Sequence, residues 1–168
     1  MQSEIVIYCD ADFAGCPHSR KSTSGGAITW GSQLVKTWAK TQPVLALSTG
    51  EAELAAVVKA SAEALGMQSV LRDLGHEVEL TVRSDATAAI GMVRREGLGR
   101  VRHLAVADLW VQQKSQEKAI KYSKIDGKQN PSDMLTKGLG AADIQRYLTM
   151  LGLVAQDGRA ASAPSIDP

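Results

Sequence analysis

Short runs of apolar and β-branched residues alternate along the chain with polar segments that contain glycine, a pattern typical of strands joined by turns. The first run, Ile5-Val6-Ile7-Tyr8-Cys9, has the composition of a buried strand and is followed by the carboxylates of Asp10 and Asp12. A tight turn at Gly31-Ser32 joins the next two runs, so the first three strands are expected to form an antiparallel meander. The predicted strands cover residues 4–10, 27–30, 34–38, 78–84 and 119–125.

Helical spacing of apolar residues is clearest between residues 49 and 73, where Leu54, Val57 and Leu65 share one face. Ser48 stands three residues before Glu51, which is a capping-box pattern at the start of this helix. Further helices are predicted at residues 86–94, 103–117 and 142–151, and another helix is predicted to begin at Pro131. The residues between about 18 and 26 read as a polar loop that ends in glycine.

The predicted elements follow the order strand, strand, strand, helix, strand, helix, helix, strand, helix. A meander followed by strand–helix units predicts an α/β fold, in which helices cover the faces of a mixed sheet. The length of 168 residues suits one domain, which we assign to residues 1–153. Residues 154–168 are rich in Gly, Ala, Ser and Pro and are expected to form a flexible tail.

The composition is that of a globular domain, with 44% hydrophobic residues and a net charge of +1. Such a charge gives no strong basic field for non-specific binding of polyanions. Cys9 lies in a predicted buried strand, so Cys9 and Cys16 are expected to be free thiols in a reducing compartment. No leader is visible and no apolar run approaches 18 residues, so we expect a monomer inside the cell, in a cytoplasmic particle or the nucleus, without a membrane span.

Four acidic residues stand where predicted elements begin or end. Asp10 ends the first strand, Glu53 lies in the first turns of the long helix, Asp85 follows the fourth strand, and Asp133 opens the helix near Pro131. If the first and fourth strands are parallel neighbours, their carboxyl ends meet in one crevice. Clustered carboxylates need a cation, and oxygen ligands suit Mg²⁺ or Mn²⁺. Two such ions about 4 Å apart are a common arrangement for phosphodiester hydrolysis.

Acids at strand ends and helix starts also occur as helix caps or as solvated surface groups, and each of the four taken alone fits that description. Asp12, Glu51 and Asp108 are assigned to such roles. Spacing alone does not decide between a metal site and four independent acids.

Five stretches of the sequence together carry a family resemblance. They are Tyr8-Cys9-Asp10-Ala11-Asp12-Phe13-Ala14-Gly15, Arg20-Lys21-Ser22-Thr23-Ser24-Gly25-Gly26, Leu47-Ser48-Thr49-Gly50-Glu51-Ala52-Glu53-Leu54, Arg83-Ser84-Asp85-Ala86-Thr87-Ala88-Ala89-Ile90 and Asn130-Pro131-Ser132-Asp133-Met134-Leu135-Thr136-Lys137. In this order and spacing, residues 5–153 resemble the ribonuclease H (RNase H) domain of copia-type LTR retrotransposon polyproteins.

The resemblance implies an RNase H-like fold, with a five-stranded mixed sheet in the order 3-2-1-4-5 and helices on both faces. It also implies hydrolysis of the RNA strand of RNA–DNA hybrids with two Mg²⁺ or Mn²⁺ ions. The four residues that correspond to the family's catalytic and metal-binding acids are Asp10, Glu53, Asp85 and Asp133. A reverse transcriptase polymerase domain in the same polyprotein is the implied partner, and Glu51 is left as a helix cap.

The candidate contacts to the hybrid are the hydroxyls and free N–H groups of Ser48, Thr49 and Gly50, the side chain of Thr87, and the basic loop residues Arg20 and Lys21. The alternatives are a plain helix cap and a solvated loop. Residues 86–88 lack the Asn-Gln pair usual in copia elements. Residues 123–130 lack the loop histidine of cellular enzymes, which implies either slower turnover or another residue in its role. Arg94, Arg95, Arg100 and Arg102 are candidates for part of the substrate-handling role, with solvated surface arginines as the alternative. Trp30 and Trp38 are assigned to the core rather than to base stacking.

Three hypotheses follow from the sequence. The first is a metal-dependent endoribonuclease that acts on hybrids. The second is a catalytically weak or inactive module of the same fold that binds hybrid as part of a reverse transcriptase. The third is a nuclease of the same fold that acts on another nucleic acid, such as DNA.

Overall fold

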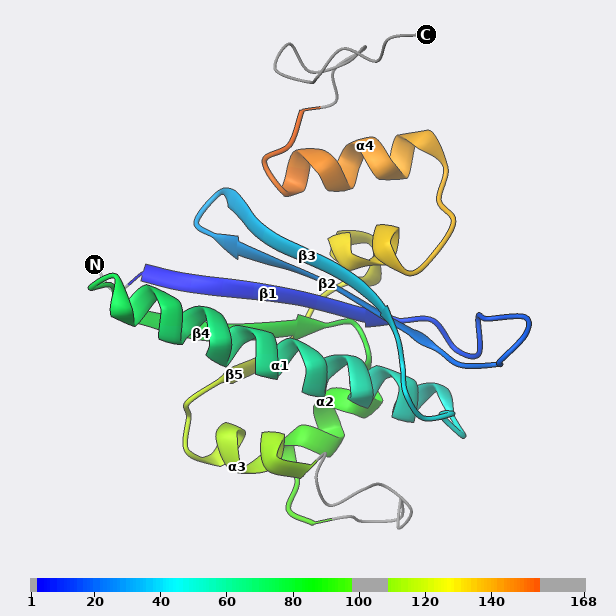
Figure 1. Ribbon diagram of the computed structural model, residues 1–168, viewed down its shortest axis with the longest axis horizontal. Helices are drawn as coiled ribbons and strands as arrows, with labels where there is room; N and C mark the ends of the chain where they lie inside the picture. The colour runs from blue at the N-terminus through cyan, green and yellow to red at the C-terminus, as the bar shows by residue number, and fades with distance from the viewer. Residues whose placement is uncertain (1–2, 98–108, 155–168) are drawn as a thin grey trace, which may run out of the picture.

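A five-stranded sheet forms the centre of the computed structural model, which describes residues 3–97 and 109–154. The strands are β1 (Ser3–Ala11), β2 (Thr23–Trp30), β3 (Gln33–Thr41), β4 (Val78–Ser84) and β5 (Lys121–Lys124). They lie in the order β3-β2-β1-β4-β5 (Figure 1). β2 is antiparallel to both β1 and β3, whereas β4 runs parallel to β1 and β5. The expected mixed α/β sheet and its strand order are therefore confirmed.

β1 occupies the middle of the sheet, and its two faces have different roles. Ile5, Ile7 and Cys9 are fully buried, and they belong to the main hydrophobic core. Because successive side chains on a strand point to opposite faces, Asp10 points away from this core. The parallel register pairs Tyr8 with Arg83, so β1 and β4 end at the same edge of the sheet.

The helices on the core side of the sheet are α1 (Thr49–Asp73), α2 (Thr87–Arg94) and α3 (Trp110–Gln116), which contribute to one core with β1, β4 and β5. α1 has the predicted bounds, because the Ser48 hydroxyl accepts a hydrogen bond from the N–H of Glu51 and starts the helix. Gly66 does not interrupt it. The predicted helix over residues 103–117 is described only as α3, and its expected core residues Leu104 and Ala107 lie outside the described residues.

Two short 3₁₀ helices, η2 (Gly127–Gln129) and η3 (Pro131–Leu135), and the helix α4 (Ala141–Met150) follow β5. η3 lies against β1 and β2, and in Figure 1 it stands with α4 on the side of these strands away from α1. A Cβ atom on Gly25 would lie 2.7 Å from Thr136 Cγ2 and 2.9 Å from Leu135 Cβ. The absence of a side chain at Gly25, the β2 partner of Asp10, therefore allows the end of η3 to lie directly on the sheet.

Two local predictions were wrong. β2 begins at Thr23 rather than at residue 27, because the backbone of residues 23–26 pairs with both β1 and β3 despite its polar composition. The helix that begins near Pro131 is a five-residue 3₁₀ helix, with Asn130 as its cap. The assignment of Trp38 to the core is confirmed, because its ring fills the space next to the bare Cα of Gly26.

α1 has the length and apolar composition of a membrane span, with a mean hydropathy of 1.2 over one 18-residue window. This differs from the expectation that no apolar run approaches that length. One helix of this kind is weak evidence for a span, since core helices have the same composition. The buried Ala52, Ala56, Ala60 and Ala64 are part of that composition, and α1 lies across β1, β2 and β4.

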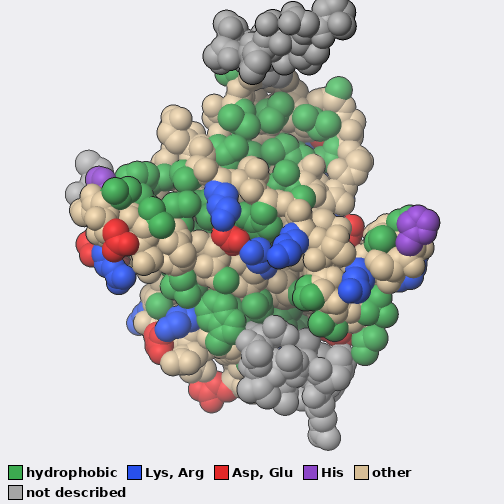
Figure 2. Space-filling model, viewed as in Figure 1, with side chains coloured by type: hydrophobic (Ala, Val, Ile, Leu, Met, Phe, Trp, Pro, Cys, Tyr) green, Lys and Arg blue, Asp and Glu red, His purple; other side chains and the backbone are tan. Residues whose placement is uncertain are grey.

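Charged groups on the surface are largely balanced. Figure 2 shows apolar side chains over much of one face, with basic and acidic side chains next to each other near its centre. Glu63 of α1 lies 2.6 Å from both Lys36 and Lys59. Lys36 and Lys40 are exposed on the edge strand β3, where lysines disfavour pairing with another sheet.

Candidate metal centre

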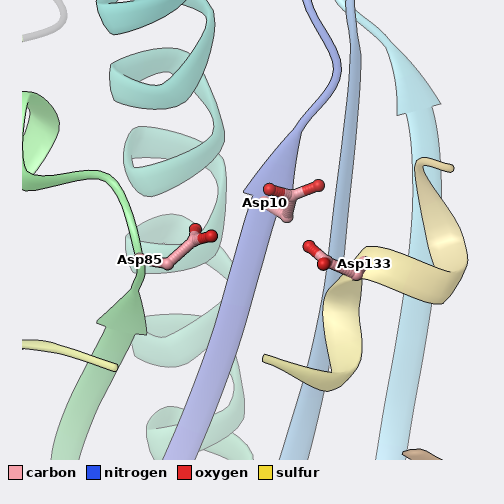
Figure 3. Close-up of side chains that lie close together, drawn as sticks. All are labelled: Asp10, Asp85 and Asp133. Carbon is pink, nitrogen blue, oxygen red and sulfur yellow. The ribbon is translucent and has the colours of Figure 1, made fainter. Parts of the chain in front are cut away.

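Three aspartates converge at the edge of the sheet where β1 and β4 end. Asp10 is near the end of β1, Asp85 directly follows β4, and Asp133 is in η3 (Figure 3). One carboxylate oxygen from each lies within 4.8 Å of the other two. Three carboxylates at this separation repel one another, so the arrangement favours a bound cation.

Asn130 holds η3 and Asp85 in place. Its side chain is fully buried, and its Nδ2 donates to the carbonyl oxygen of Cys9 at 3.0 Å and to Asp85 Oδ1 at 3.4 Å. Its Oδ1 accepts hydrogen bonds from the N–H and hydroxyl of Ser132. Asn130 thus connects β1, the acid after β4 and the helix that carries Asp133.

Asp10 has two polar partners from the end of η3. The hydroxyl of Thr136 donates to Asp10 Oδ2, and Lys137 Nζ lies 3.3 Å from each of the two Asp10 oxygens. Lys137 Nζ also donates to Asp133 Oδ1 at 2.9 Å. The Asp10 side chain is only 1% exposed, so these contacts replace the water that an exposed carboxylate would have.

The electrostatics of Asp10 reflect this environment. Burial is the main cause that raises the pKa of Asp10 to about 6. The hydrogen bond from Thr136 and the charge of Lys137 oppose the rise, whereas the charges of Asp133 and Asp85 add to it. The carboxylate is therefore only partly stabilised by the protein groups around it.

Glu53 projects from α1 toward the same edge but is not part of the cluster of three aspartates. Burial, followed by the charges of Asp10 and Asp85, raises the pKa of Glu53 to about 8. Its Oε2 atom is buried and has no hydrogen-bond partner. A buried acceptor without a donor normally costs free energy, and a divalent cation would satisfy it. The residues present therefore fit a site for hard cations with only oxygen ligands.

Comparison with solved structures identifies the fold. No family model matches the chain. LC11-RNase H1, isolated from compost by a metagenomic approach, aligns with a TM-score of 0.56 and 18% identity over 79% of this chain and 92% of its own. The N-terminal RNase H domain of a Mycobacterium tuberculosis protein aligns with a TM-score of 0.53 and 14% identity over 88% of this chain and 98% of its own.

Comparison with curated proteins identifies the family of related proteins. The Pol polyprotein of transposon TNT 1-94 from Nicotiana tabacum is 34% identical over 132 residues, which is 77% of this chain. The chain is an RNase H-like domain related to copia-type retrotransposon Pol polyproteins. The RE1 polyprotein of Arabidopsis thaliana is 26% identical over 154 residues, and the RNase H-like domain spans 10% of the length of either polyprotein.

Two other acids near the centre of the RNase H-like domain have structural roles, and the predicted capping role of Glu51 is confirmed, whereas Asp12 is neither a helix cap nor a solvated surface acid. Glu51 accepts hydrogen bonds from the N–H of Leu47 at 2.9 Å and from the hydroxyl of Ser48 at 3.1 Å, so it belongs to the cap of α1. Asp12 accepts a hydrogen bond from the N–H of Thr23 and closes the loop between β1 and β2. Asp108 lies outside the described residues.

The predicted substrate contacts lie around this edge in different settings. Ser48 and Thr49 are exposed at the start of α1, although the Ser48 hydroxyl is already bonded to Glu51. Gly50 packs near Met92, since a Cβ there would lie 3.2 Å from Met92 Cε.

The other contact candidates differ in accessibility. Thr87 is exposed and accepts a hydrogen bond from Lys124 at 2.7 Å. Arg20 is exposed and Lys21 is half-buried in the loop between β1 and β2. Their contact with nucleic acid stays a prediction.

The arginines at and after the end of α2 were candidates for substrate handling, with solvated surface arginines as the alternative. Arg94 instead donates to the carbonyl oxygen of Tyr122 at 2.7 Å, which ties α2 to β5. Arg100 and Arg102 lie outside the described residues.

Sequence reasoning missed three residues of the centre: Asn130, Thr136 and Lys137. All three are in the stretch that carried the family resemblance, which was used only to assign Asp133. The available signal was that polar residues flank Asp133 on both sides in the sequence. Their partners Cys9 and Asp10 are more than 120 residues away in sequence, so local patterns did not reveal the contacts.

Proposed function

We propose that this RNase H-like domain is an endoribonuclease that hydrolyses the RNA strand of RNA–DNA hybrids, with Asp10, Glu53, Asp85 and Asp133 as ligands of two Mg²⁺ or Mn²⁺ ions. The observation that carries the proposal is the convergence of three aspartates within 4.8 Å beside a buried glutamate whose Oε2 has no partner. The fold likeness to LC11-RNase H1, which has been solved in complex with an RNA/DNA hybrid, supports the choice of substrate.

The cations would supply charge neutralisation, a more acidic bound water and stabilisation of the leaving 3′-oxygen. The carboxylates of the chain would position these ions, and each carboxyl group must lose its proton before it can bind one. Asp10 and Glu53 must be ionised to act as ligands, and both have raised pKa values. Protons and metal ions therefore compete for these carboxylates, so cleavage at a limiting metal concentration is expected to increase as pH rises. Thr136 fixes the orientation of Asp10, and Asn130 fixes Asp85.

Recognition of the hybrid is assigned to the groups that surround this edge. We propose that the start of α1 at Ser48, Thr49 and Gly50 receives a phosphate, because free N–H groups at a helix start favour anions. Thr87, Arg20 and Lys21 are proposed as further contacts. The domain would act within a polyprotein beside a reverse transcriptase polymerase domain, since its relatives are Pol polyproteins.

The test is cleavage of a fluorescently labelled RNA–DNA hybrid by the purified domain in Mg²⁺, with Asp10→Asn as the variant. Removing a group that stabilises transition-state charge costs about 10²-fold or more, so Asp10→Asn is expected to lose at least that much. Asp143→Asn is the matched control, because Asp143 is an exposed acid paired with Arg146 on α4.

Equal cleavage in excess EDTA would refute the metal mechanism. Tight binding of hybrid by the unmodified domain without any cleavage would instead identify an inactive binding module. Single-stranded RNA, double-stranded RNA and double-stranded DNA, offered in parallel, separate a hybrid-specific enzyme from a nuclease of the same fold with another substrate.

A further inference from the structure

Lys137 places a positive charge inside the acidic centre. Its ammonium lies 2.9 Å from Asp133 Oδ1 and 3.3 Å from each oxygen of Asp10. Asp133 is four residues earlier in the chain, whereas Asp10 is on the central strand and is 1% exposed. The ammonium therefore contacts two of the three clustered aspartates in the way that a bound cation would.

The contacts of Lys137 divide the centre into two unequal halves. Its ion pairs are with Asp10 and Asp133, while Asp85 accepts a hydrogen bond from the neutral amide of Asn130. Glu53 has a buried oxygen, Oε2, without a hydrogen-bond partner, and the charges of Asp10 and Asp85 act on this residue. Among the described residues, the ion pairs of Lys137 are thus with Asp10 and Asp133, and neither Asp85 nor Glu53 has a direct ion pair with it.

We propose that Lys137 is a tethered cation that occupies the Asp10–Asp133 half of the centre, so that a divalent ion enters this half only by displacing the lysine ammonium. Glu53 and Asp85 have no such ion pair with Lys137, so the first ion reaches their oxygens without displacing the ammonium. The proposal deepens the proposed function and rests on it, because it concerns the same metal ligands.

The side chain of Lys137 is suited to leave. It is 41% exposed, and its four-carbon stem lets the ammonium move into water without movement of the backbone. A divalent ion competes for the same oxygens with twice the charge. Displacement nevertheless costs free energy, because the ammonium gives up contacts with a desolvated carboxylate, where charges interact more strongly than in water. The second ion is therefore expected to bind more weakly than the first.

Lys59 shows what an ordinary surface pair looks like in this chain. It pairs with Glu63 at 2.6 Å with the same spacing of four residues, and it is 36% exposed. Glu63 is 18% exposed and is not part of the cluster of aspartates. A change at Lys59 thus removes one positive charge and one ion pair of the same kind without altering the centre.

The experiment is a calorimetric titration of the metal-free domain with Mn²⁺, which needs no substrate. The unmodified domain should bind two ions with unequal affinities. Lys137→Gln should tighten the weaker site by about tenfold, equivalent to about 1.4 kcal/mol, and should change the stronger site by much less. Lys137→Arg retains the charge and should retain the weak second site. Lys59→Gln should leave both affinities unchanged.

Circular dichroism and thermal unfolding of each variant show whether it folds, and Lys137→Met is a second uncharged variant in case the glutamine variant does not. An unchanged weaker site in both uncharged variants, or equal tightening of both sites, overturns the inference. If hybrid cleavage by the unmodified domain is then observed, the proposed function stands without it. Absence of Mn²⁺ binding in every variant overturns both.

Discussion

Replacing Glu53 with glutamine should make the metal-free domain more stable at pH 8, although it removes a proposed metal ligand. Burial and the charges of Asp10 and Asp85 raise the pKa of Glu53 from 4.5 to about 8 in the folded protein. Between these two values the folded state binds more protons than the unfolded state. The free energy of unfolding therefore falls as pH rises through this window, which is the sign expected for an acid whose pKa is raised by folding.

The size of the effect follows from the shift. One pKa unit corresponds to about 1.4 kcal/mol, so ionisation of Glu53 between about pH 5 and pH 8 costs on the order of 3 kcal/mol. Domains of this kind have a total stability of about 5–15 kcal/mol, so the cost is a substantial fraction. The glutamine side chain has nearly the same shape and no charge. Glu53→Gln should thus match the unmodified domain near pH 5 and exceed its stability by about 3 kcal/mol at pH 8.

Urea unfolding in EDTA at the two pH values, followed by the fluorescence of the three tryptophans, measures this difference. Glu63→Gln on the same helix is the control with the opposite sign. Hydrogen bonds from Lys36 and Lys59 lower the pKa of Glu63, so its contribution to stability is present above the pKa of the unfolded state and is lost as pH falls. Glu63→Gln should therefore give no gain at pH 8.

Two results would refute this reasoning. One is a metal-free domain whose stability relative to Glu53→Gln does not fall between pH 5 and pH 8. The other is a Glu53→Gln variant that is less stable than the unmodified domain at pH 8. Addition of Mg²⁺ at pH 8 should stabilise the unmodified domain more than Glu53→Gln, because a ligand stabilises the state that binds it.

Three further outcomes are expected. Gly25→Ala should destabilise the domain by about 1–3 kcal/mol in urea unfolding and reduce hybrid cleavage, because the new methyl group would displace the end of η3; unchanged values would show that η3 does not need this close approach. Asn130→Ala should cost roughly 2 kcal/mol, since buried hydrogen-bond partners on three segments lose their donor or acceptor, and a loss below about 0.5 kcal/mol would contradict that network. A thiol reagent at neutral pH should label Cys16 in the native protein and Cys9 only after unfolding. Burial raises the pKa of the Cys9 thiol well above its usual value, whereas hydrogen bonds involving Ser19 lower the pKa of the Cys16 thiol. Rapid labelling of both thiols in the native protein would disprove the burial of Cys9.

The parts of the fold that depend on local signals were predicted well. The bounds of α1 follow from the pattern of Ser48 and Glu51, and the end of β1 follows from the change from apolar residues to Asp10. The start of β2 was not predicted, because Thr23–Gly26 has no strand-like composition and is held by pairing on both sides. Tertiary hydrogen bonds outweighed local preference there.

Of the four acids predicted to converge, three form the cluster, and Glu53 is not part of it; their function as a site stays a prediction. Asp10 and Asp85 come together because β1 and β4 are parallel neighbours, an arrangement that the family resemblance implied, and η3 adds Asp133. The separate environment of Glu53 depends on how α1 lies across the end of β1, and helix periodicity does not report that placement. The contacts of Lys137 with Asp10 depend on η3, a 3₁₀ helix that packs against the first strand although the two are far apart in the sequence.

The hydrogen bond from Thr136 to Asp10 joins residues that are 126 positions apart. At a synthesis rate of about 5–20 residues per second, a ribosome needs roughly 6–25 seconds to travel from one to the other. A nascent chain therefore carries its first strand for many seconds before the last acid exists. Premature termination before Asp133 would leave a polypeptide with three of the four acids and no complete centre. Assembly of the cluster of Asp10, Asp85 and Asp133 is therefore a late event in the synthesis of this domain.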